Sequence, residues 1–274
     1  MKPAVVPPLV TPADWGGLRR FTDARIALGR SGHSQPTAAH LAFQLAHAQA
    51  RDAVYATLDE AAVSSAVEAL GLVPAVLSSA APSREAYLQR PDWGRRLDAP
   101  SRDRWQALQP RPACPPADLV FVIADGLSSR AVNQHAVPLL AHLLPLLRGD
   151  PAQRWLLAPV ALVRQGRVAV GDEVGELLYA RCSVVLIGER PGLSSPDSLG
   201  VYFTWAPRVG RTDAQRNCIS NVRQAGLSPE RAAHKLYTLL TRARALQLSG
   251  LALKDESDGA SETLTNRSTF TRDN

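Results

Sequence analysis

The stretch Leu119–Ala124 reads LVFVIA, and Asp125-Gly126-Leu127-Ser128 follows it directly. Six consecutive apolar residues are typical of a strand that is covered on both faces of a sheet. The small polar turn leads into residues 129–147, whose apolar spacing predicts a long helix. The alternation continues, with strands predicted at residues 155–163, 167–170, 183–187 and 200–205 and helices at 172–181 and 228–247. This order predicts an α/β fold with a Rossmann-like parallel sheet flanked by helices.

The chain before this pattern is predicted to be helical, and the protein divides into four segments. Residues 1–15 are rich in proline. Residues 16–116 form a helical N-terminal region, with helices predicted at 37–58, 60–70 and 84–89, and end in a connector whose prolines disfavour any regular element. Residues 117–254 form the α/β domain. Residues 255–274 hold seven Ser and Thr and five acids, and we expect a disordered tail there.

Composition and charge exclude several classes of protein. The 274 residues carry 31 Lys and Arg against 25 Asp and Glu, a formal net charge of +6. Arginine supplies 28 of the 31 bases, which fits either a compositional habit or a large interface. The arginines are interleaved with acids, and aromatic residues make up only 5%, so we expect no nucleic-acid binding. The longest nearly apolar stretch, residues 136–147, is too short to span a membrane. Three cysteines without a CxxC pattern fit a reducing cytoplasm.

Ligands of open α/β sheets bind beyond the carboxyl ends of the strands, and three segments are candidates for that position. The turn at 125–128 fits either a polar ligand site at a helix N-terminus or an ordinary turn in which Ser128 caps the helix. Glu189 directly follows an apolar run and fits a ligand acceptor, with a surface pair to Arg190 as the alternative. Cys218, predicted to lie between the last strand and the last helix, fits either a nucleophile or inert packing.

Common catalytic signatures are missing from the sequence. No GxGxxG follows a strand, no GxxxxGK[ST] phosphate loop is present, and residues 192–196 (GLSSP) begin like the hydrolase elbow GxSxG but end in proline. A free-standing hydrolase or transferase that uses Ser194 or Cys218 is one hypothesis, and a non-catalytic scaffold is another. The lack of a self-contained catalytic set favours a third, the binding half of a larger enzyme.

Several longer strings occur together in one order. They are LRRFTDARIALGR (18–30), RPDWGRRL (90–97), IADGLS (123–128), VGE (174–176), GERPGL (188–193) and RNCISN (216–221). Over about residues 15–254 the chain resembles the small (light) subunit family of ethanolamine ammonia-lyase. The resemblance implies an ammonia-lyase that uses adenosylcobalamin to convert ethanolamine to acetaldehyde and ammonia through a 5′-deoxyadenosyl radical. It also implies that a large, barrel-type subunit holds the substrate while the small subunit covers the cobalamin.

The resemblance implies three cofactor contacts in this chain and no catalytic residue or metal ligand. Val168, within GRV at 166–168, gives an apolar wall and a backbone that hydrogen bonds. Glu189, within GERPGL, accepts hydrogen bonds from the amide side chains of the corrin ring. Cys218, within RNCISN, is a small polarisable neighbour of the cofactor. The DxHxxG signature is absent, so the cofactor's own benzimidazole is expected to remain the lower ligand of cobalt.

The expected partner is the large subunit, in a hetero-oligomer that the resemblance implies to be a trimer of two-large, two-small units. Without residues 255–274 the chain carries 29 bases and 20 acids. Seven arginines lie between Arg84 and Arg111, and we predict that part of this excess, including Arg95 and Arg96, faces the large subunit. The expected location is the cytoplasm, and the short Pro-rich N-terminus leaves enclosure in a bacterial microcompartment open.

Overall fold

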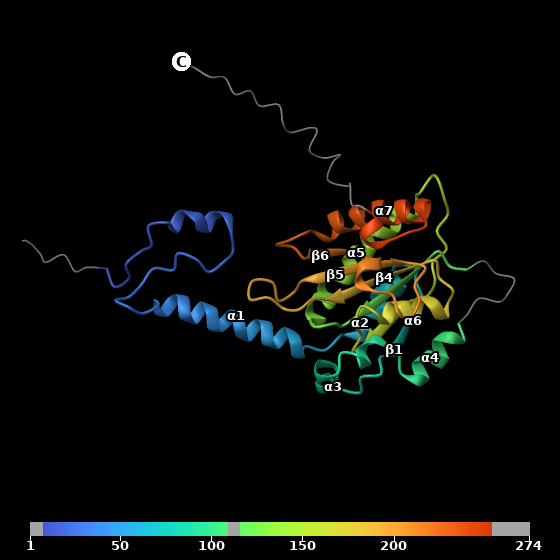
Figure 1. Ribbon diagram of the computed structural model, residues 1–274, viewed down its shortest axis with the longest axis horizontal. Helices are drawn as coiled ribbons and strands as arrows, with labels where there is room; N and C mark the ends of the chain where they lie inside the picture. The colour runs from blue at the N-terminus through green and yellow to red at the C-terminus, as the bar shows by residue number, and fades with distance from the viewer. Residues whose placement is uncertain (1–7, 109–115, 254–274) are drawn as a thin grey trace, which may run out of the picture.

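A six-stranded sheet lies between two layers of helices in the computed structural model, which describes residues 8–108 and 116–253 (Figure 1). The strands are β1 (Pro74–Ser78), β2 (Leu119–Ala124), β3 (Val160–Arg164), β4 (Cys182–Gly188), β5 (Leu199–Trp205) and β6 (Arg216–Val222). The α-helices are α1 (Thr37–Tyr55), α2 (Glu60–Ala69), α3 (Arg84–Gln89), α4 (Ala99–Gln106), α5 (Ser129–Arg148), α6 (Val170–Leu177) and α7 (Pro229–Leu246). Four short 3-10 helices are η1 (Gly16–Phe21), η2 (Trp93–Arg95), η3 (Asp213–Gln215) and η4 (Gly250–Ala252). The predicted tail at 255–274 lies outside the described residues, as do parts of the predicted Pro-rich segment and connector.

The strand order is β1-β3-β2-β4-β5-β6. The first four strands are parallel, whereas β5 and β6 run antiparallel to their neighbours. The predicted α/β class, with helices flanking a mainly parallel sheet, is therefore confirmed. The antiparallel part follows from a short connection, because residues 189–198 join β4 to β5 without a helix. A parallel pair needs a crossover of about a dozen residues or more, usually a helix.

Alternate strand residues contribute to two separate hydrophobic layers. Phe121 and Ile123 of β2 pack with α2, α5 and α7 on one face of the sheet. Val120 and Val122 pack on the other face, together with Trp105 of α4 and residues of α6. Every residue of β2 and β4 is buried, as the continuous apolar runs predict for strands that are covered on both sides.

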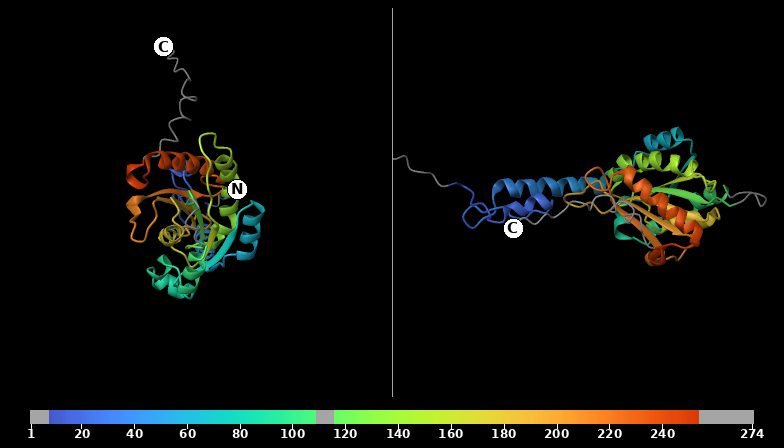
Figure 2. Two further views of the ribbon diagram at one scale, coloured as in Figure 1. Left: turned by 90° about the vertical axis from the view of Figure 1, so that its right-hand side faces the viewer. Right: turned by 90° about the horizontal axis from the view of Figure 1, so that it is seen from above.

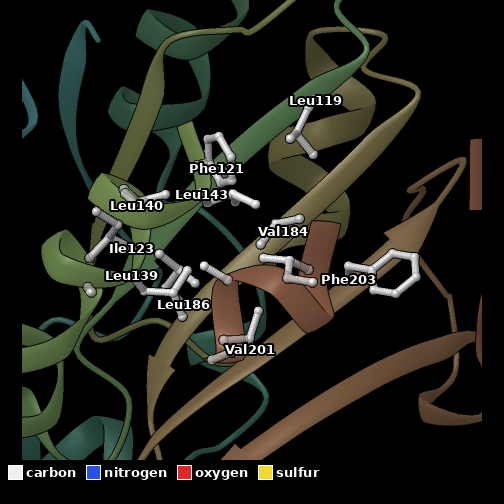
Figure 3. Close-up of a cluster of buried hydrophobic side chains, with 14 of the residues drawn as sticks. Leu119, Phe121, Ile123, Leu139, Leu140, Leu143, Val184, Leu186, Val201 and Phe203 are labelled. Atoms are coloured by element: carbon white, nitrogen blue, oxygen red, sulfur yellow. The ribbon is translucent and has the colours of Figure 1, made fainter. Parts of the chain in front are cut away.

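Helix α5 anchors the carboxyl end of β2. Ten of its 20 residues are buried, and Figure 3 shows Leu139, Leu140 and Leu143 packed against Phe121 and Ile123. The Ser128 hydroxyl caps the helix by accepting the N–H of Ala131 at 3.3 Å. Buried packing supplies most of a helix's stability. The packing of α5 on β2, together with the Ser128 cap, therefore fixes the turn between β2 and α5.

The structure corrects several local predictions. Residues 167–170 form a turn and the first residue of α6, and not a strand. Cys218 lies on β6, an edge strand, and not in the connection before the last helix. Helix α4 forms within the Pro-rich connector, because Pro100 occupies its first turn, where no N–H group is needed. Strand β1, which the sequence did not predict, pairs with β3 at the other edge of the sheet.

Residues 8–55, called here the N-terminal arm, extend away from the sheet. Helix α1 projects from the body, and residues 8–36 double back beside it in both views (Figures 1 and 2). Backbone hydrogen bonds of 2.8 and 2.9 Å join Thr11 and Arg30 within the arm. None of the helices in residues 8–108 and 116–253 has the length and apolar character needed to cross a membrane.

Candidate functional site

A cavity of about 380 Å³ opens at the carboxyl ends of β2, β3 and β4. The chain leaves β2 toward α5 on one face of the sheet and leaves β3 toward α6 on the other. Crevices of this kind are where open α/β sheets bind ligands. The lining residues of this carboxyl-end cavity are Tyr87, Leu127, Arg167, Val168, Ile187, Gly188, Glu189, Arg190 and Tyr202. The structure thus brings together Val168 and Glu189, two of the three predicted cofactor contacts.

Val168 is half-buried in the turn between β3 and α6. The buried carboxylate of Asp125, at the end of β2, holds this turn by accepting the N–H groups of Gln165 at 3.0 Å and Gly166 at 3.1 Å. Burial raises the pKa of Asp125, and the two N–H groups work against that rise. The polar groups of the 125–128 turn are therefore engaged inside the protein, which favours the structural interpretation of that segment.

Three stacked side chains, those of Arg84, Tyr87 and Arg167, support the turn between β3 and α6. The buried ring of Tyr87 lies between two guanidinium groups, that of Arg84 at 4.8 Å and that of Arg167 at 4.2 Å. Arg84 also donates to the carbonyl oxygens of Gly126 at 2.7 Å and Val54 at 2.8 Å. The stack therefore connects the last turn of α1, the end of β2 and the wall of the cavity.

The motif at residues 90–97 packs directly onto this stack. The Gly94 carbonyl accepts the N–H of Arg167 at 2.7 Å. A Cβ atom at Gly94 would lie 2.7 Å from Cγ of Arg167 and 3.1 Å from the ring of Tyr87, so only glycine allows this approach. Arg95 and Arg96 of the same motif are exposed, and their contact with a large subunit stays a prediction.

Glu189 is half-buried at the rim of the cavity. One carboxylate oxygen, Oε2, accepts the hydroxyl of Ser198 at 2.5 Å and the N–H of Asn221 at 3.3 Å. No residue of the described chain donates a hydrogen bond to the other oxygen, Oε1. Glu189 is thus oriented by two groups of the protein through one oxygen while the second oxygen is available to a donor, and it is not a simple surface partner of Arg190.

Cys218 does not line the cavity itself, but it lies next to a residue that does. It is exposed on β6, directly opposite Tyr202 of β5, and its sulfur is 3.2 Å from the hydroxyl of Ser220. Burial and the hydrogen bond with Cys218 raise the pKa of Tyr202 above its usual range, so that side chain is a neutral phenol at ordinary pH. Cys218 is therefore placed beside the predicted site, and its role stays a prediction.

Sequence reasoning did not name Tyr87, Ile187 or Tyr202 as site residues, although all three line the cavity. Leu127 and Arg167 lie within segments that it did single out, the turn at 125–128 and the string GRV at 166–168. Tyr87 precedes the 90–97 motif, and nothing in its local sequence shows that it packs against residues about 80 positions later. That long-range contact exists only in the folded chain.

The structure does not assemble the alternative nucleophilic sites. Ser194 is exposed, and its carbonyl accepts a hydrogen bond from Arg223 at 3.2 Å. A nucleophile would need a nearby base, and two histidines that could serve as one are engaged elsewhere: His135 with Asp197 at 3.4 Å, and His234 with the carbonyl of Glu230 at 3.0 Å. Within residues 8–108 and 116–253 no three His, Cys, Asp or Glu side chains cluster as metal ligands.

Two other hollows are less suited to a ligand. One of about 820 Å³ lies at the amino ends of β1 and β3, between residues 71–73 and 147–159, the end of the sheet opposite to the usual ligand position. The other, of about 370 Å³, lies between the end of α1 and the stack that includes Arg84. Its two basic side chains are already engaged, Arg164 with Glu60 and Arg84 with backbone carbonyls.

Comparison with known proteins identifies the family of this chain. The family described as "Ethanolamine ammonia-lyase light chain (EutC)" matches residues 12–254. A curated relative from Azotobacter vinelandii, named "Ethanolamine ammonia-lyase small subunit", is 59% identical over 249 residues and 90% of each chain. Relatives of the same name come from Ralstonia nicotianae, at 57% identity over 92% of each chain, and from Pseudomonas syringae pv. tomato, at 56% identity over 89% of this chain and 83% of the relative. The chain therefore belongs to the ethanolamine ammonia-lyase light-chain family.

Proposed function

We propose that the chain is the small subunit of an adenosylcobalamin-dependent ethanolamine ammonia-lyase, and that its carboxyl-end cavity binds one edge of the cobalamin. The observation that carries the proposal is the placement of Val168 and Glu189 on the same cavity. They are 21 positions apart in the sequence, and both come from family motifs. Both residues lie at the crevice where the chain continues from β2 and from β3 toward opposite faces of the sheet. This position supports a common ligand.

The chemistry of the lining fits a corrin ring with amide side chains. Val168, Leu127 and Ile187 offer an apolar wall, suited to the hydrocarbon part of a large ligand. Glu189 Oε1 offers a charged acceptor for an amide N–H group, and hydrogen bonds to charged groups are the stronger kind. When bound, adenosylcobalamin would supply the radical chemistry of the reaction.

The residues of this chain bind, orient and shield; they do not carry the reacting atoms. Glu189 and the turn of Val168 orient the edge of the cofactor, and Cys218 with neutral Tyr202 closes the side toward β6. The substrate site belongs to a large, barrel-type subunit, so turnover needs both chains. A trimer of two-large, two-small units and a location in the cytoplasm, free or within a microcompartment, belong to the same proposal.

The first test is reconstitution with the large subunit. We expect the complex to convert ethanolamine to acetaldehyde and ammonia only when adenosylcobalamin is added. Turnover of ethanolamine without this cofactor, or hydrolase activity of the isolated chain that is lost in Ser194→Ala, would contradict the proposal.

The second test addresses Glu189. Loss of a charge-assisted hydrogen bond costs about 1–3 kcal/mol, which is roughly a 5- to 150-fold rise in the Kd for cobalamin. The Kd is measured from the absorbance of the bound cofactor. Glu189→Gln keeps a carbonyl acceptor and is expected to bind more tightly than Glu189→Ala. Glu230→Ala, which changes an exposed side chain at the start of α7, is the matched control. Unchanged cofactor binding and activity in Glu189→Ala would remove Glu189 from the site.

A further inference from the structure

The N-terminal arm carries an unusual share of the exposed apolar side chains. Its 48 residues hold nine of them, and the other 191 described residues hold six. The nine are Leu9, Val10, Trp15, Leu18, Phe21, Leu41, Phe43, Leu45 and Tyr55. Single exposed apolar residues are ordinary on a protein surface, but a concentration of them on one projecting element marks an interaction site.

Helix α1 cannot owe its stability to the contacts that the structure shows. It buries only Ala46 and Ala53 among 19 residues, whereas α5 buries ten of 20. Leu41 and Leu45, four positions apart and therefore neighbours on one face, are 57% and 60% exposed. In folded proteins, packing of an apolar face supplies most of the stability of a helix. The exposed face of α1 therefore lacks the covering that a helix of this kind needs.

The arm contacts the body near the carboxyl-end cavity at two places. At its base, the Val54 carbonyl accepts a hydrogen bond from Arg84 of the stack. Within the segment that doubles back, Arg25 donates to the carbonyl of Leu193 at 3.3 Å, in the loop that follows Glu189. In Figures 1 and 2 α1 projects from the same side of the body as this loop. A protein that contacts this side of the arm would therefore lie next to the cavity.

We infer that the exposed face of α1, with Leu41 and Leu45 at its centre, is a docking surface for the large subunit. The inference rests on the proposed function, because it takes the large subunit as the partner that closes the cavity. The position of the arm beside the cavity is what favours this partner over a second copy of the chain. The arm then adds a second contact between the two subunits, next to the cavity that binds the cofactor.

The test compares two double variants of the full chain. Leu41→Gln/Leu45→Gln replaces the face with polar residues of good helix propensity. Val73→Gln/Leu251→Gln is the matched control, because these residues are 66% and 83% exposed but belong to the opposite end of the body. The Kd for the large subunit is measured by biolayer interferometry, and the sedimentation of each isolated chain is measured separately.

We expect the α1 variant to bind the large subunit at least about tenfold more weakly than wild type, as loss of central apolar contacts does at other interfaces, while the control binds as wild type does. Equal Kd values for the two variants would overturn the inference and leave the proposed function intact. A change confined to self-association would also overturn it, in favour of a second copy as the occupant. Failure of the wild-type chain to bind the large subunit would instead contradict the proposed function.

Discussion

Replacing Asp172 by asparagine should destabilise the protein strongly, because within the described chain it removes the buried counter-charge of the Arg216 guanidinium and leaves the fully exposed carboxylate of Asp213, 3.5 Å away. Arg216, at the start of β6, and Asp172, in the first turn of α6, are 8% and 1% exposed. Two parallel hydrogen bonds join them, Nη1 to Oδ1 at 2.5 Å and Nη2 to Oδ2 at 2.7 Å. Burial alone would lower the pKa of Arg216, but the bonds from Asp172 raise it overall, so the guanidinium stays charged.

The magnitude follows from the cost of a buried charge that loses its buried partner. Removal of one partner of such a pair costs about 3–5 kcal/mol, which in a domain of this size lowers the Tm by roughly 6–20 °C. Arg216 also donates to the hydroxyl of Thr204 at 3.0 Å and to the carbonyl of Arg211 at 2.8 Å. These two bonds keep the guanidinium inside the protein in Asp172→Asn, so the charge cannot turn out to water at little cost.

The assay is urea unfolding of the full chain, followed by circular dichroism. The double variant Asp172→Asn/Arg216→Met removes the charge as well, and it should be more stable than the sum of the two single variants predicts, by at least about 1 kcal/mol. A loss of less than 1 kcal/mol in Asp172→Asn would refute the reasoning, since it would mean that water reaches the guanidinium.

Since the pair joins β6 to α6, cofactor binding beside Val168 and Cys218 should weaken together with stability.

Two further predictions concern the cavity. Burial raises the pKa of Tyr87 to about 12, against 10.0 for the free side chain. As the pH rises, the unfolded chain therefore loses this proton first, and the free energy of unfolding should fall between pH 10 and pH 12 by up to about 1.4 kcal/mol per pH unit. Urea unfolding of Tyr87→Phe should show a smaller fall over the same pH range. Gly126→Ala should unfold at a much lower urea concentration than Gly32→Ala. Both glycines have φ near +60°, which costs alanine about 1–2 kcal/mol, but only at Gly126 would the new Cβ lie 2.3 Å from a backbone oxygen, that of Gly188. Equal midpoints for the two alanine variants, or the same pH slope with and without the Tyr87 hydroxyl, would contradict these expectations.

The part of the fold that the sequence predicts well is the part whose residues are buried on both sides. Local sequence patterns predict β2, β4 and α5, because β2 and β4 are continuous apolar runs and α5 has apolar residues at helical spacing. β1 carries no such signal: it has five residues, of which only Leu77 is buried, and it lies at an edge of the sheet. Its identity as a strand depends on pairing with β3, which is not visible in local sequence.

The candidate site divides in the same way. Val168, Glu189 and Cys218 were predicted from motifs, and the cavity brings the first two together. The residues that hold the cavity in shape were not found, because Arg84, Tyr87 and Arg167 act through contacts between distant parts of the chain. Motifs indicate candidate ligand-binding side chains, whereas the side chains that support them are recognised only from the folded structure.

The pairing of β1 with β3 has a consequence for the newly made chain. Pro74 lies opposite Val160 in the finished sheet, so the ribosome must add 86 more residues before the first strand can find its neighbour. At a synthesis rate of about 5–20 residues per second, that takes roughly 4–17 s. Throughout this interval the nascent segment presents an unpaired strand edge and, ahead of it, the leucines of α1. We therefore expect production of this protein to depend on chaperones, and to improve when the large subunit is made at the same time.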